Sequence, residues 1–92
     1  MFIGTLIIDL FIPESNSLKY RRQVVKSVKD KIKRNFNVGV AEDDTDKWQR
    51  ARIFVVGVNG NKSCLERVFS SVEKMITGFR NVEVIDTSRE FF

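Results

Sequence analysis

The order of the hydrophobic patterns along the chain constrains its fold more than any other feature. Two segments carry apolar residues at the spacing of an amphipathic helix, and four segments carry the Ile, Val and Phe content of strands. We expect helices over residues 18–36 and 63–79, and strands over residues 2–12, 37–42, 48–59 and 82–87. Ser17 is the expected N-cap of the first helix, whereas Asn61 competes with a Ser63–Glu66 capping box for the second.

This order of elements, β-α-β-β-α-β, predicts an α+β fold of the ferredoxin-like kind. Right-handed crossovers and a central hairpin would give a four-stranded antiparallel sheet with both helices on one face. The first and third strands would then lie in the middle of the sheet. The chain of 92 residues is long enough for one such domain, so we expect residues 1–92 to form a single unit.

The residue composition argues against several classes of protein. The chain contains no His and one Cys, so it can build neither a His-dependent catalytic triad nor an internal disulfide. The apolar run at residues 2–12 is interrupted by Asp9 and is shorter than the roughly 20 residues of a membrane helix. We therefore expect a cytoplasmic, non-enzymatic protein with no cofactor, no metal, no membrane contact and no small-molecule substrate.

The two central strands are apolar on both faces, although helices can cover only one face of this sheet. An antiparallel sheet with a wet face normally alternates apolar with polar residues. We expect the helix-free face to mediate self-association, with a homodimer as the simplest outcome. Base stacking by RNA and scattered apolar exposure are two alternatives, and the spaced aromatics of RNA-recognition sheets are absent. The residues expected at this interface are Ile3, Ile7, Phe11, Ile53 and Val55.

The first predicted helix concentrates the positive charge of the chain. Residues 18–36 hold eight Lys or Arg and one acidic residue, which gives +7, whereas the whole chain carries +4. On a helical wheel five of these cations form a stripe about 21 Å long beside the apolar arc. The stripe could bind phosphates or could be a solvated helix surface, and we expect the Arg21 head to reach water from the apolar margin. The basic stripe consists of Lys19, Arg22, Lys26, Lys29 and Lys33.

An acidic segment, Glu42, Asp43, Asp44 and Asp46, begins at the last residue of the second expected strand. It could neutralise the basic stripe, and a third hypothesis uses Glu42, Asp43 or Asp46 as acid and base groups around Mg²⁺. The segment lacks the ligand order and the central Gly of an EF-hand, so we expect a solvated loop. Trp48, Gln49 and Arg50 come next, where an indole beside a guanidinium can stack or anchor an interface.

Two blocks of the sequence carry a family resemblance: SLKYRRQVVKSVKDKIKRNFNVGVAE and, after a polar loop, WQRA. With LERV in the second helix they resemble the YlxP-like family of small bacterial proteins. Tyr20 and Gly39 depart from the usual acidic residue and Ser. The matching residues are Pro13, Ser17, Leu18, Lys19, Arg21, Arg22, Val24, Val25, Lys29, Asp30, Phe36, Asn37, Val38, Val40, Ala41, Glu42, Trp48, Gln49, Arg50 and Ala51.

The resemblance implies a ferredoxin-like α+β domain without catalytic residues. It also implies genes that lie beside those for a translation initiation factor and a ribosome-binding factor. The leading hypothesis from the sequence is therefore an RNA- or ribosome-associated protein that uses the basic stripe. The alternative is a self-associating module that does not bind nucleic acid.

Overall fold

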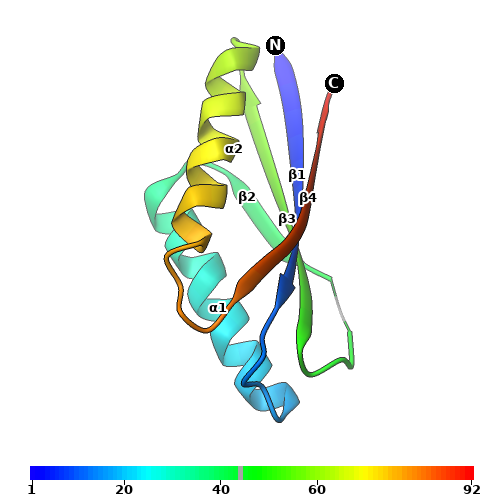
Figure 1. Ribbon diagram of the computed structural model, residues 1–92. Coiled ribbons are helices and arrows are strands. Elements are labelled where there is room, and N and C mark those ends of the chain that lie inside the picture. Colours follow the sequence, from blue (N-terminus) through cyan, green and yellow to red (C-terminus); the bar gives the residue numbers. More distant parts are fainter. Residues whose placement is uncertain (44) are drawn as a thin grey trace.

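The structure is a computed structural model that describes residues 1–43 and 45–92, and it confirms the ferredoxin-like α+β fold. The sheet is antiparallel throughout and has the strand order β2-β3-β1-β4. Both helices cover the same face, and the two termini lie at the same end of the molecule (Figure 1). The elements are β1 (Phe2–Phe11), α1 (Leu18–Asn35), β2 (Gly39–Glu42), β3 (Arg50–Asn59), α2 (Lys62–Ile76) and β4 (Glu83–Phe91).

Both helices begin at side-chain caps. The Ser17 hydroxyl accepts a hydrogen bond from the Tyr20 amide at 3.1 Å, as the sequence predicted. At α2 the Asn61 side chain is the cap, because its oxygen accepts from the amides of Ser63 and Cys64. The hydroxyl of Ser63 donates to the same oxygen at 2.6 Å, so Ser63 supports the cap and does not form it.

The last strand is longer than the sequence predicted. β4 runs to Phe91, and its pairing with β1 reaches Gly4. Beyond it, the backbones of Ile3 and Phe92 exchange two hydrogen bonds of 3.2 and 2.7 Å. The prediction that the strand ends at Thr87 was wrong, because the segment SREFF lacks clean alternation and is held by pairing with a central strand.

The core lies between the sheet and the helices. Alternate residues of β1, from Leu6 to Leu10, and Ile12 just after the strand are fully buried in one core with residues of α1 and Phe69 of α2. Gly4 and Gly57 face each other across β1 and β3. A Cβ atom at Gly4 would lie 2.9 Å from the Phe69 ring, and one at Gly57 would lie 2.8 Å from a Leu65 methyl group. The paired glycines therefore let α2 pack closely on the two central strands.

The strand register corrects the sequence prediction for β3. Directly paired residues of antiparallel strands share a face, and Val55 pairs with Leu6 while Ile53 pairs with Ile8. All four side chains are fully buried. The prediction that Ile53 and Val55 lie on the helix-free face was wrong, since both faces of β3 are apolar and hydrophobicity alone does not set its phase. The outward residues of β3 include Phe54, Val56 and Val58.

In the described part of the chain, neither helix is long and apolar enough to span a bilayer.

Candidate nucleic-acid interface

The basic stripe of α1 meets β2 at Lys29, and Arg22 lines a hollow with Thr45 and Asp46. Four of its members, Lys19, Arg22, Lys26 and Lys33, are exposed. Lys29 is half-buried, because it reaches across to the last residue of β2. The five cations of the basic stripe therefore differ in exposure: four face solvent, and Lys29 is partly covered.

Two members of the stripe are already paired. Lys26 donates to Asp30 at 2.9 Å within the helix, and this hydrogen bond lowers the pKa of Asp30 below its ordinary value. Lys29 forms an ion pair of 2.9 Å with Glu42. Among the described residues, no carboxylate pairs with the other three members of the stripe, which we call the free cations: Lys19, Arg22 and Lys33.

Arg21 does not reach water, contrary to the sequence prediction. Its side chain is only 2% exposed, and its Nη2 donates to the Thr45 carbonyl at 3.3 Å. Nη1 lies 3.8 Å from the Glu42 carboxylate, and within the described residues neither Nε nor Nη1 has a hydrogen-bond partner. The prediction failed because Thr45 and the last residue of β2 lie against the guanidinium. Glu42 consequently faces two cations, Arg21 and Lys29.

The acidic segment does not assemble into a metal centre in the part of the chain that the structure describes. Glu42 belongs to β2 and is engaged by α1, whereas Asp43 and Asp46 are exposed. Asp44, the remaining member of the predicted loop, lies outside the described residues. The Mg²⁺ hypothesis thus gains no support from the described carboxylates.

The register aligns the outward side chains of the helix-free face into rows across the sheet. We call the three rows nearest the start of β1 the apolar rows. In them β1 and β3 pair Ile3 with Val58, Thr5 with Val56, and Ile7 with Phe54. Ile3, Val56 and Val58 are 44%, 40% and 57% exposed. Ile3, Ile7 and Phe11 lie on this face as the sequence predicted; whether the face binds a second copy stays a prediction.

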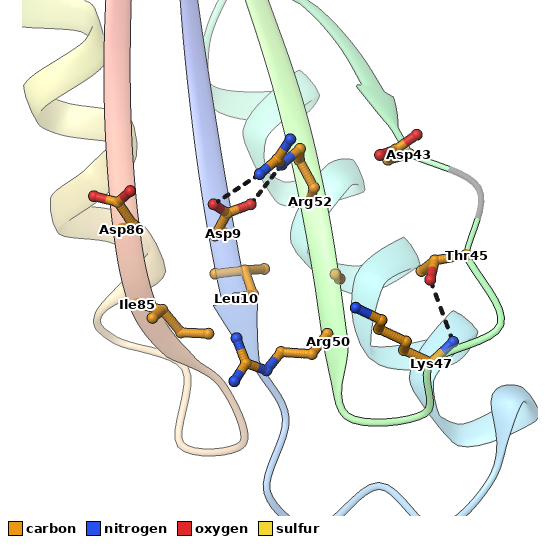
Figure 2. Close-up of a pocket in the computed structure, with 10 residues that line it drawn as sticks. Asp9, Leu10, Asp43, Thr45, Lys47, Arg50, Arg52, Ile85 and Asp86 are labelled. Carbon is orange, nitrogen blue, oxygen red and sulfur yellow. Dashed lines mark hydrogen bonds and ion pairs between the residues drawn. The ribbon is translucent and has the colours of Figure 1, made fainter.

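The next row is charged, and the sequence analysis missed it. Arg52 donates to both carboxylate oxygens of Asp9, at 2.7 and 3.2 Å, and these bonds raise the pKa of Arg52 above its ordinary value. Figure 2 shows this pair between β1 and β3, with Asp86 on β4 and Asp43 after β2 to either side. The available signal was Asp9 itself, a carboxylate inside an apolar strand.

A β-bulge places one more apolar residue beside this charged row. The pairing of β1 with β4 shifts between Asp9 and Leu10, so Ile85 has no partner on β1. Its side chain is 46% exposed and lines a hollow of about 390 Å³ together with Arg50 and Lys47 (Figure 2). The hollow carries carboxylates and cations in equal number, and its guanidinium at Arg52 is already paired.

The comparisons with known proteins agree with this architecture. A family described as "Protein of unknown function (DUF503)" matches residues 3–89. The chain belongs to this family. The uncharacterised protein YlxP of Bacillus subtilis is 29% identical over 91 residues, which cover 98% of this chain and 99% of the relative. The resemblance to YlxP-like proteins is thereby confirmed.

Solved structures share the fold at low sequence identity. The de novo designed protein Foldit4 is 17% identical, with a TM-score of 0.57 and coverage of 100% of this chain and 97% of the design. SnoaB, a cofactor-independent oxygenase from Streptomyces nogalater, is 9% identical, with a TM-score of 0.52 and coverage of 98% and 90%. At these identities the likeness concerns the fold alone.

Proposed function

We propose that this family member is a non-enzymatic, cytoplasmic RNA-binding protein that contacts phosphates through the basic stripe of α1, free in solution or on the ribosome. The observation that carries the proposal is the set of free cations, Lys19, Arg22 and Lys33, with which no described carboxylate forms an ion pair. Like charges aligned on one helix repel one another, and a polyanion relieves that repulsion.

The dimensions of the stripe suit a nucleic-acid backbone. Its length of about 21 Å equals the axial rise of roughly six nucleotides at ~3.4 Å each. Because Lys26 and Lys29 are held by Asp30 and Glu42, we expect three phosphate contacts and not five. These three stripe contacts should together contribute roughly 2 to 3 to the slope with which the logarithm of the binding constant falls against the logarithm of salt concentration.

Titration of the protein with RNA at several salt concentrations tests this proposal. Arg22→Gln and Lys33→Gln should each flatten the slope by roughly 0.7–0.9. Lys74→Gln is the matched control, because Lys74 is also an exposed helical lysine but lies on α2. If the control changed the slope as much as the two stripe variants did, binding would depend on the net charge of the protein and not on the basic stripe, which would contradict the proposal.

Self-association is a second candidate, and the three apolar rows of the helix-free face favour it. Across all four strands, about 4.8 Å apart with residues ~3.4 Å apart, the five rows from Ile3 to Phe11 span at most roughly 600 Å². This area includes the polar β4 residues Ser88 and Glu90, which pair with β1 in the same rows. Two such faces bury about 1,200 Å², which is the lower limit for a stable interface. A second copy fits because a two-fold axis brings identical apolar rows together.

Analytical ultracentrifugation tests the second candidate. The wild-type chain should form a dimer that dissociates at micromolar concentration. The Val58→Asp variant should remain a monomer, because dimerisation would bury the new carboxylate in the interface. Val58 is 57% exposed, so this change should leave the free energy of unfolding of the monomer almost unaffected. A wild-type chain that stays monomeric at high concentration contradicts self-association.

A further inference from the structure

Trp48 is a large aromatic side chain that the fold leaves uncovered. It is 54% exposed, although the backbone beside it is fixed. The Gln49 carbonyl accepts from the Ile12 amide at 2.8 Å, and the Gln49 side chain donates to the Pro13 carbonyl at 3.0 Å. The indole is therefore presented to solvent from a fixed position at the start of β3.

The groove around Trp48 combines aromatic rings with cations. It has a volume of about 610 Å³, and Phe11, Lys47 and Arg50 line it beside the indole. The Arg50 guanidinium already lies over the Phe11 ring, 5.8 Å from its centroid. Flat aromatic and guanidinium surfaces flanked by positive charge are the features that hold an unstacked nucleobase and its phosphate.

This groove continues into the basic stripe. Asp46 lines both the Trp48 groove and a second hollow, of about 440 Å³, which Arg22 and Leu18 of α1 also line. Arg22 is one of the free cations. One nucleic-acid strand can therefore run from the first turns of α1 past residues 45–47 to the indole, provided that its phosphates lie toward Arg22 and Lys47 and away from the Asp46 carboxylate.

We infer that the ligand of the proposed function is single-stranded RNA, with one unpaired base stacked on Trp48 and neighbouring phosphates at Lys47 and Arg50. This inference rests on the proposed phosphate binding by α1. The bases of a duplex are stacked on one another and cannot reach the indole, so a single strand should bind more tightly than a duplex of equal length. Stacking is tolerant of sequence, so little base preference is expected.

The intrinsic fluorescence of the chain tests the inference directly, because Trp48 is its only tryptophan. A short oligouridine should quench the emission to a saturating value, whereas an abasic oligonucleotide of equal length should bind without quenching. Fluorescence anisotropy of labelled oligonucleotides measures both affinities. Trp48→Ala should weaken oligouridine binding about 5- to 100-fold and leave abasic binding unchanged. Trp48→Phe, which keeps an aromatic ring, should stay within about threefold of the wild type.

The possible results separate this inference from the proposal beneath it. If oligouridine binds with the salt dependence of the stripe but Trp48→Ala changes nothing and no quenching occurs, the stacking inference is overturned while phosphate binding by α1 survives. A duplex that binds as tightly as the single strand and quenches equally also overturns the inference. If neither oligouridine nor the abasic strand binds, both proposals fail. The exposed Trp48 side chain would then indicate a protein partner.

Discussion

The buried contact of Arg21 with Glu42 offers the sharpest test of how α1 is held. We consider Glu42→Gln, which removes the charge and keeps the shape of the side chain. The side chain of Arg21 is 2% exposed, and its guanidinium would lose the nearby carboxylate. Breaking a buried ion pair costs about 3–5 kcal/mol, but Glu42 is 28% exposed and lies 3.8 Å away. We therefore expect a loss of about 2–3 kcal/mol, which includes up to about 1 kcal/mol from Lys29.

Thermal and urea denaturation measure this loss. For a chain of this length, 2–3 kcal/mol corresponds to a fall in melting temperature of about 10–15 °C. Lys29→Met is the matched control, because it breaks only the more accessible pair with Glu42 and should cost less than about 1 kcal/mol. Arg21→Met should be nearly neutral, since an apolar side chain of similar length replaces a guanidinium with unsatisfied N–H groups.

A double-mutant cycle tests whether Glu42 compensates the buried charge of Arg21. In the Arg21→Met background, Glu42→Gln should cost less than about 1 kcal/mol, because the stranded charge is gone. If Glu42→Gln alone changes stability by less than about 0.5 kcal/mol, or costs the same in both backgrounds, Glu42 does not compensate the buried guanidinium.

Two further predictions concern packing and pH. Gly4→Ala should destabilise the fold by about 1–2 kcal/mol in urea denaturation, because the new methyl group meets the buried Phe69 ring; Gly60→Ala, with open space around it, should not. Asp30 has a lowered pKa, so its ion pair with Lys26 stabilises the fold above the unfolded pKa of Asp30 and is lost as pH falls through the lowered folded value. An NMR titration should show the pKa of Asp30 rising to its ordinary range in Lys26→Met, and an unchanged pKa would contradict the pairing.

The parts of the fold that follow from local patterns could be predicted from the sequence. The helical wheel identified both the apolar seam of α1 and its basic stripe, because both depend only on helical geometry. The Ser17 cap was equally local. These features need no information on how distant segments meet.

The second helix ends at Ile76 and not at residue 79, which is a local error, but the other failures involve contacts between distant segments. The face of Ile53 and Val55 depends on which residues of β1 pair with them, and a one-residue shift would reverse the answer. The burial of Arg21 depends on the chain after β2, and Ile85 is turned outward by a bulge in the pairing of β4. A single sequence does not encode register or bulges in any local pattern, so these errors share one physical cause.

The two candidate surfaces are coupled through the last row of the sheet. Even across all four strands, the three apolar rows alone span at most roughly 300 Å² per subunit, which gives a total typical of crystal contacts. A stable dimer must therefore also use the charged row and the row that contains Phe11 and Arg50. Phe11 and Arg50 line the Trp48 groove, so a second copy seated on all five rows would cover the proposed base site. Dimerisation and single-stranded RNA binding should then compete, and by linkage oligouridine should shift a wild-type dimer toward monomers.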